Sequence, residues 1–141
     1  MATTTAQEAD LSGALVQAMH VLQDLYAETS RPLGLTPQQA HLLCVLLAGP
    51  LGMTELSRIL SIERSSLTSM VDRLERRDLV ARIPHPTDRR ACHINLTPAG
   101  LSLADEAHDA FTTRIEALTA NLSPTARRTL TTTLLAVFSP S

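Results

Sequence analysis

The sequence predicts a mainly α-helical protein with one small β-hairpin, and three observations support this fold class. Over most of the 141 residues, apolar side chains recur at spacings of three and four, the spacing that lines one face of a helix. Proline and glycine divide the chain into segments of helical length. Residues 79–96 instead alternate apolar and polar side chains around a proline-containing loop, which is typical of two paired strands.

Length and composition indicate one soluble domain in the cytoplasm. A chain of this length buries about two-thirds of the surface that its unfolded form exposes. No apolar run approaches the roughly 20 residues that span a bilayer, and the first residues lack a secretion signal, so we expect no membrane partner. Cys44 and Cys92 are too few for a disulfide framework, which favours reduced thiols.

The charge distribution matters more than the formal net charge of −2, which argues against a uniformly basic nucleic-acid binder. All 12 basic residues are arginines, and none is lysine. Most of them lie within residues 54–96, whereas acidic residues predominate in the flanking segments. The middle of the chain is therefore mildly basic, and the two ends are acidic.

The two ends of the chain predict helices with apolar stripes. One runs from Asp10 to about Ser30, and a second begins at Pro98 after the cap Thr97. Ser123 begins the last helix in the same way. These stripes exceed what a small central domain covers, so we expect the helices to pair with one another and with a second copy of the chain. The stripe residues of the two C-terminal helices are Ala104, Ala107, Phe111, Ile115, Leu118 and Leu122, then Leu130, Leu134, Val137 and Phe138.

Two helices are expected between these ends. Thr36, with proline after it and Gln39 three positions on, predicts a capping box that starts an almost wholly apolar helix. Thr54 is the predicted cap of a short helix over residues 55–60. In that helix Leu56, Ile59 and Leu60 are expected to face inward.

Residues 64–77 predict a helix with two unlike faces. Leu67, Met70, Val71 and Leu74 share one side, where they would bind a core. Short hydroxyl side chains on the other side would let the backbone approach a DNA major groove, where arginines reach guanine edges or phosphates. The alternative is an ordinary solvated face, and the helix alone does not decide between them. The free face carries Arg64, Ser65, Ser66, Thr68, Ser69 and Arg73.

The predicted hairpin joins residues 79–83 and 91–96 through a loop with two prolines and two arginines. Alternation places Cys92, Ile94 and Leu96 on its apolar face. Arg89 or Arg90 could enter a minor groove, with Asp88 pairing to hold the loop. The alternative is a surface ion pair of little energetic value. A short helix, a turn, a polar-faced helix and an arginine-tipped hairpin, in this order, indicate a DNA-binding winged helix-turn-helix.

Residues 35–100 carry the segments LTPQQ, MTELSRIL, SSLTSMVDRLERRDLV, DRR and LTPAG, and this combination resembles the MarR family of dimeric bacterial winged-helix transcription regulators. The resemblance implies a homodimer, held by its N- and C-terminal helices, that represses transcription from a pseudo-palindromic operator. It assigns Arg90 to the minor groove and Asp88 to orienting it. The sequence departs from the family at Asp78, where glycine is common.

We therefore expect one MarR-like domain over residues 1–141, with dimerisation helices at 10–34 and 98–139 and a winged lobe at 35–97. The recognition helix is residues 64–77, and the wing is residues 82–96. Double-stranded DNA and a second copy of the chain are the expected partners. The predicted DNA-binding residues are Arg64, Ser65, Ser66, Thr68, Ser69, Arg73, Arg77, Asp88, Arg89 and Arg90.

The resemblance also implies a small-molecule effector bound between the dimer arms and the DNA-binding lobes. By position, His20, Asp24, His41 and Cys44 are candidates to line its site, and the alternative is that they are helix-packing residues. We expect no metal and no cofactor.

Three further hypotheses compete with that of a DNA-binding regulator. His41 and Cys44, three residues apart on one helix, suit an oxidant- or metal-responsive regulator, but core packing is the stronger interpretation because no third ligand is indicated. His85 and His93 are expected to be surface residues. A winged helix that binds only proteins remains open. An enzyme is not expected, because no oxyanion site, phosphate-cradling loop or acid/base pair is indicated.

Overall fold

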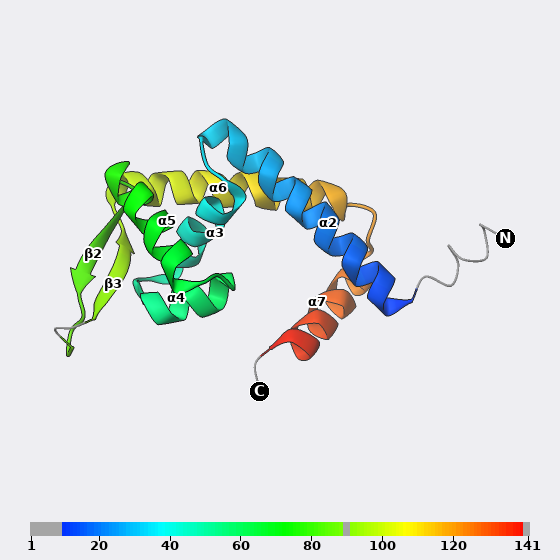
Figure 1. Cartoon of the computed structure of the whole chain (residues 1–141). Helices are drawn as coiled ribbons and strands as arrows, with labels where there is room; N and C mark the ends of the chain where they lie inside the picture. The colour runs from blue at the N-terminus through cyan, green and yellow to red at the C-terminus, as the bar shows by residue number, and fades with distance from the viewer. Residues whose placement is uncertain (1–9, 89–90, 140–141) are drawn as a thin grey trace. The chain divides into compact units, whose positions relative to one another are not determined.

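The computed structural model describes residues 10–88 and 91–139 and confirms a mainly helical chain with a small sheet (Figure 1). The chain divides after Phe111 into two compact units, which are described separately. In chain order the elements are α2 (Leu11–Ser30), η1 (Arg31–Leu33), α3 (Pro37–Val45), η2 (Leu46–Ala48), β1 (Leu51–Gly52), α4 (Met53–Leu60), α5 (Arg64–Arg76), β2 (Val80–Pro84), β3 (Cys92–Leu96), α6 (Pro98–Leu118) and α7 (Pro124–Phe138).

The sheet has three antiparallel strands in the order β1-β3-β2. The predicted hairpin is β2 and β3, in which Arg82 pairs with Ile94. On its other side, Ile94 pairs with Leu51 of β1. Strand β1 was not predicted, because two residues are too few to show an alternating pattern.

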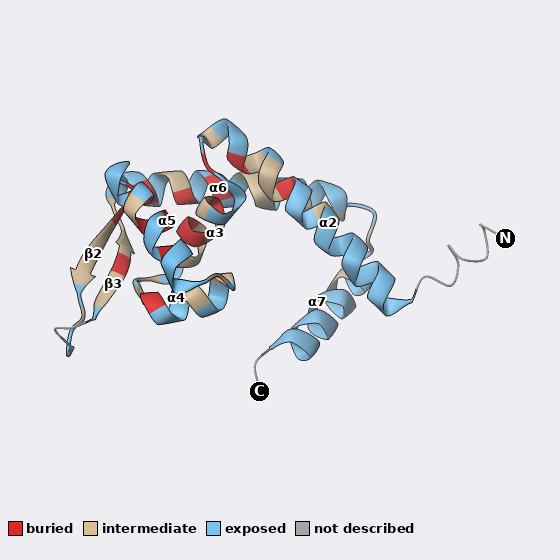
Figure 2. Cartoon of the chain, in the orientation of Figure 1, coloured by how far each residue is buried: buried red, intermediate tan, exposed pale blue. Residues whose placement is uncertain are grey.

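The core of the first unit is built from α3, α4 and α5, closed by β3 and α6. Figure 2 shows the buried residues gathered on these elements. The predicted inner face of α5 is confirmed, since all four of its apolar residues are buried. Burying one such side chain stabilises the fold by about 1.5 to 3 kcal/mol. The largest fully buried apolar side chains are Leu42, Leu43, Leu56, Leu67, Leu74, Ile94, Val71 and Val80.

The helix starts were predicted with mixed success. The capping box is confirmed: the Gln39 backbone N–H donates to Thr36 Oγ1 at 3.1 Å, and the Thr36 N–H donates to Gln39 Oε1 at 3.0 Å. The prediction that Thr54 caps the next helix was wrong. Strand pairing keeps the backbone extended as far as Gly52, so α4 begins directly afterwards at Met53, and Thr54 lies inside its first turn.

A left-handed residue follows each of the two helices α4 and α5. Ser61, at φ 53°, ends α4, where the Ile62 N–H donates to the Ser57 carbonyl. Asp78, at φ 58°, follows α5 in the same type of motif, since the Leu79 N–H donates to the Leu74 carbonyl at 2.9 Å. Asp78 therefore occupies a left-handed position of the kind that favours glycine.

Two apolar residues were placed wrongly from the sequence. Ile59 was expected to face inward but is 44% exposed, because it lies about 60° around the helix from the fully buried Leu56. Leu122 was expected on the long helix, but α6 ends at Leu118. Leu122 lies in the connection to α7, where the following Ser123–Pro124 pair starts a new helix.

The second unit, Thr112–Ser141, contains the end of α6 and all of α7. Ser123 caps α7 as predicted, accepting a hydrogen bond from the Ala126 N–H at 3.1 Å. Arg127 donates to the Thr119 carbonyl and pairs with Glu116 at 3.4 Å. None of the described residues after 111 is buried, so α7 carries an exposed apolar face (Figure 2). That face includes Leu130, Leu134, Leu135, Val137 and Phe138, from 39% to 64% exposed.

Over residues 10–88 and 91–139, no helix is both long and apolar enough to cross a bilayer.

Candidate nucleic-acid interface

The outer face of α5 is a continuous polar surface. The six side chains predicted for this face are all exposed, while Leu67 and Val71 hold the opposite side against the core. Ser65, Ser66 and Ser69 are short, so little stands between the helix backbone and an approaching partner. The structure thus brings these predicted residues together on one rigid surface.

Arg64 begins α5 and is oriented by the neighbouring helix. Its Nη1 donates to Thr54 Oγ1 of α4 at 3.2 Å. The Thr68 hydroxyl donates to the Arg64 carbonyl at 2.9 Å, so its oxygen remains able to accept. The start of α5 therefore presents one oriented guanidinium beside hydroxyl groups.

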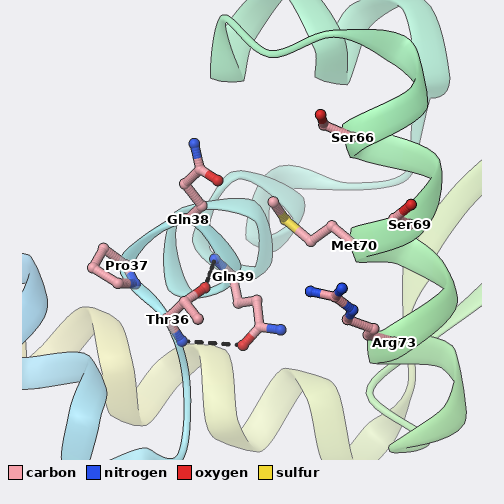
Figure 3. Close-up of a pocket in the computed structure, with 8 residues that line it drawn as sticks. All are labelled: Thr36, Pro37, Gln38, Gln39, Ser66, Ser69, Met70 and Arg73. Atoms are coloured by element: carbon pink, nitrogen blue, oxygen red, sulfur yellow. Dashed lines mark hydrogen bonds between the residues drawn. The ribbon is translucent and has the colours of Figure 1, made fainter.

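Arg73 lies further along the same face and borders a cavity of about 610 Å³ between α5 and the start of α3. Figure 3 shows its guanidinium extending across this cavity toward the side formed by Gln39. The remaining lining residues are Thr36, Pro37, Gln38, Ser66, Ser69 and Met70.

Arg77 has a contact that the sequence did not reveal. It is the C-cap of α5, and its Nη1 donates to the Gly34 carbonyl at 2.8 Å. This bond ties the end of α5 to the turn after η1. Arg77 stands about 20 Å along the helix from Arg64, and its role as a DNA contact stays a prediction.

Arg82 links the hairpin to the recognition helix, and sequence reasoning missed it. Its guanidinium spans two carboxylates of α5, at 2.7 Å from Asp72 Oδ1 and 2.6 Å from Glu75 Oε1. The hydrogen bond with Asp72 raises the pKa of Arg82, and Glu75 adds to this. In the sequence, Arg82 stands ten residues after Asp72 and seven after Glu75. Opposite charges at these separations predict no contact unless the path of the strand is known.

The hairpin tip is held by a histidine. His85 Nδ1 accepts the backbone N–H of Thr87 at 3.1 Å and that of Asp88 at 3.0 Å. The His85 ring also meets the ring of His93 edge to face, with centroids 4.7 Å apart. Both histidines are partly exposed, as expected for surface residues. Two of the predicted contact residues, Arg89 and Arg90, lie outside the described residues.

Of the four predicted effector residues, His41 lines a cavity beside α2 and the start of α3. This cavity, about 400 Å³, also has Tyr26 in its lining, and the two rings lie 5.8 Å apart. His20 and Asp24 are exposed on α2 and do not line it. Cys44 lies elsewhere on α3 and donates to the Ala104 carbonyl at 3.8 Å. The other lining residues are Gln23, Pro37, Gln38 and Leu60.

Burial controls the ionisation of these groups. It lowers the pKa of His41, so the imidazole is neutral at pH 7. Burial, followed by the nearby Cys44, raises the pKa of Tyr26. Burial, followed by Asp105, raises the pKa of Cys44, which keeps its thiol protonated and poorly reactive. These shifts favour a packing role for Cys44 over oxidant sensing.

A metal-responsive role for His41 and Cys44 has no structural support. Within the described ranges, no group of three or more histidine, cysteine, aspartate or glutamate side chains is arranged to hold a metal ion.

Comparison with known proteins identifies the family. A sequence model of the MarR family matches residues 33–91, which include α3 to β2. The multiple antibiotic resistance protein MarR of Escherichia coli (strain K12) is 33% identical over 98 residues, covering 68% of this chain and 68% of that protein. The chain belongs to the MarR family.

Other MarR-family relatives match shorter stretches. MarR of Salmonella typhimurium is 36% identical over 78 residues, which cover 55% of this chain and 54% of that protein. The chain thus spans about half the length of this relative.

Solved MarR-family structures share the fold over nearly the whole chain. One is a cysteine-to-serine variant of E. coli MarR complexed with operator DNA. It matches with a TM-score of 0.70 and 29% identity, covering 92% of this chain and 99% of that one. NadR in complex with 4-hydroxyphenylacetate matches with a TM-score of 0.81 and 26% identity, covering 95% and 96%. One of these structures is bound to operator DNA, and the other is bound to 4-hydroxyphenylacetate.

Proposed function

We propose that this MarR-family chain is a sequence-specific DNA-binding transcriptional regulator that acts as a homodimeric repressor in the cytoplasm. The recognition helix, residues 64–77, enters a major groove of a pseudo-palindromic operator, and the wing, residues 82–96, contacts the adjacent minor groove. One observation carries the proposal: the exposed face of α5, with short hydroxyl side chains and oriented arginines, is held rigidly by a fully buried opposite face.

The chemistry of this face suits groove insertion. Arginine donates two parallel hydrogen bonds to a guanine edge or binds a phosphate, and Arg64 is already oriented by Thr54. Small serine side chains allow the close approach that a major groove requires. Arg82 joins the hairpin to α5 through Asp72 and Glu75, so helix and wing would meet the duplex as one body.

Dimerisation accounts for the exposed apolar faces. In α2, Leu11 is 75% exposed and Val16 is 50% exposed, and α7 is exposed along its length. Residues 10–34 and 98–139 act as dimerisation helices around the winged lobe, residues 35–97, within one MarR-like domain. A second copy covers these faces and doubles the number of phosphate contacts, which offsets the formal net charge of −2. The two recognition helices then enter grooves about 34 Å apart.

The family relatives support regulation and not catalysis. The E. coli relative is a multiple antibiotic resistance protein, and MdtR of Bacillus subtilis, 32% identical over 92 residues, is a transcriptional repressor. We propose no enzymatic activity for this chain.

The experiment selects genomic fragments that bind the purified protein and then measures the affinity of the best fragment by fluorescence anisotropy between 50 and 200 mM salt, roughly the range over which phosphate contacts are lost. Log affinity should fall linearly with log salt, with a slope of about −0.9 per phosphate neutralised. If no fragment is enriched, or if affinity is insensitive to salt, a winged helix that binds only proteins is the better account.

A second proposal concerns a small-molecule effector. The cavity beside Tyr26 and neutral His41 offers aromatic walls with hydrogen-bonding groups from Gln23 and Gln38. A ligand there releases the operator. Small molecules that release the selected fragment should lose their effect in His41→Ala, whereas His20→Ala, on an exposed part of α2, should behave as wild type. An effector that acts equally on both variants would remove this cavity from the proposal.

A further inference from the structure

The tip of the hairpin depends on one side chain. His85 is the residue after β2, and its Nδ1 accepts two successive backbone N–H groups, those of Thr87 and Asp88. The tip is also closed by backbone bonds, from the His85 N–H to the Ala91 carbonyl at 3.3 Å and from the Ala91 N–H to the Asp88 carbonyl at 3.2 Å. His85 thus does for this turn what an aspartate or asparagine side chain does in an Asx-turn.

The two amide donors determine which nitrogen of the His85 ring carries the proton. A backbone N–H can only donate, so the nitrogen that accepts from Thr87 and Asp88 must carry a lone pair. The neutral ring therefore bears its proton on Nε2. A second proton has to go to Nδ1, and both backbone bonds to the ring are then lost, although the Thr87 hydroxyl, 3.3 Å from Nδ1, can accept from the new N–H. The shape of the tip is consequently linked to the charge of one imidazole.

We infer that His85 is the positioning residue of the wing and that its protonation releases the tip and weakens DNA binding. The inference rests on the proposed function, because the wing matters only if it meets a duplex. Histidine is the side chain whose charge most readily changes near neutral pH, so pH is the variable that the test changes.

The groups around His85 favour two alternative states. A cavity of about 260 Å³ at the base of the hairpin is lined by His85 and also by Glu55 of α4, Arg64 of α5 and Cys92 and His93 of β3. Asp88 follows in the same loop. The carboxylates attract a protonated ring, whereas Arg64 and a protonated His93 repel it. The neutral ring holds the turn through two amides, and the charged ring cannot accept from them.

The predicted direction of the change in DNA affinity with pH separates this mechanism from a simple effect of charge. Adding positive charge to a DNA-binding surface strengthens attraction to phosphates. A histidine near the wing that acted only through its charge would therefore make binding tighter as the pH falls. Release of the tip makes binding weaker, so the sign of the pH effect tells the two apart.

The test compares operator affinity at pH 8 and pH 6 in four proteins. His85→Asn keeps an acceptor, Oδ1, at the position of Nδ1 but does not titrate, and His85→Ala has no acceptor. His108→Asn, which removes an exposed imidazole from α6, is the matched control. Wild type and His108→Asn should lose about fivefold in affinity on acidification, the effect of one ordinary hydrogen bond. His85→Asn should bind equally at both pH values, and His85→Ala should be weak at both.

Binding that tightens on acidification in the wild type, or a His85→Asn variant that follows the wild type, would overturn the inference. We call the two bonds from the Thr87 and Asp88 amides to His85 Nδ1 the latch. A nuclear magnetic resonance titration of the free protein tests the latch separately from the proposed function. The amide signals of Thr87 and Asp88 should move together with the titration of the His85 ring. If they do and no DNA binding is found at pH 8, the latch stands and the proposed function fails. If DNA binding is normal but those amides do not respond, the latch fails.

Discussion

The winged lobe and the C-terminal helix α7 are both made of amphipathic segments, but only the lobe covers its own apolar side chains. Leu56 and Leu67 of the lobe are fully buried, whereas Leu135 and Phe138 of α7 are 62% and 63% exposed. Both regions have good helix caps, in Thr36 and Ser123. The difference therefore lies in packing and not in local helix formation.

This contrast assigns the two regions different roles. Each large apolar side chain left in water forgoes about 1.5 to 3 kcal/mol of burial energy, so a face of several such side chains indicates a missing partner. The lobe needs no partner to form its core and can present α5 as a rigid surface. The terminal helices are where a second copy of the chain would bind, and four changes test this division.

The largest effect should come from removing α7. A chain that ends before Ser123 loses the exposed apolar face of α7 and should be monomeric in sedimentation velocity, with its operator affinity lost as well. Because a truncation can act indirectly, Leu134→Glu combined with Phe138→Glu provides a second variant with the same expected result.

The control for that pair is Thr132→Glu, which adds charge to α7 at an exposed threonine. It should remain dimeric. A truncated chain that still sediments as a dimer would contradict the assignment of α7 to the dimer interface. The exposed apolar face of α7 would then have no explanation.

The next effect concerns the lobe itself. Leu67→Ala removes a fully buried side chain between α5 and the core and should lower the free energy of unfolding by about 2 to 5 kcal/mol, measured by urea denaturation. Ser65→Ala, two residues earlier on the exposed face, should change it by no more than about 0.5 kcal/mol. Equal effects at both positions would mean that the two faces of α5 are wrongly assigned.

Arg90→Ala tests the wing and should cost about 1 to 3 kcal/mol of operator affinity in an anisotropy titration, the effect of one specific contact. The dimer should remain intact. Arg31→Ala, outside the winged lobe, is the charge-matched control and should bind nearly as the wild type does. If Arg90→Ala binds with unchanged affinity, Arg90 has no part in the interface.

The smallest effect is expected at Asp78. Glycine has no Cβ and adopts a φ of 58° without strain, so Asp78→Gly should raise the free energy of unfolding by about 0.5 to 1 kcal/mol. Ser69→Gly, in the middle of α5, should lower it by a similar amount. Destabilisation by Asp78→Gly would indicate that the aspartate side chain makes a contribution larger than the backbone strain.

Local patterns predicted the parts of the fold that depend on near neighbours. The capping box at Thr36, the two faces of α5 and the start of α7 at Ser123 each follow from residues within one or two turns. They could be read from the sequence because periodicity and capping act over three to eight residues.

The rest depends on residues far apart in the sequence. Thr54 was misassigned because β1 pairs with β3, some 40 residues later, and fixes Gly52 as the helix start. The bonds from Arg82 to Asp72 and from Arg77 to Gly34 likewise need the folded chain. His85 is a different case. Its contacts are local, but histidine is not among the usual turn-capping residues, so no sequence pattern predicted its role.

The central claim is that a dimer presents two winged lobes to one operator, and footprinting of the best selected fragment tests it most directly. We predict two protected major-groove segments, related by approximate two-fold symmetry, with centres about 34 Å apart. Each should be flanked by minor-groove protection that Arg90→Ala removes. A single protected segment, from a protein that sediments as a dimer under the same conditions, would contradict the account.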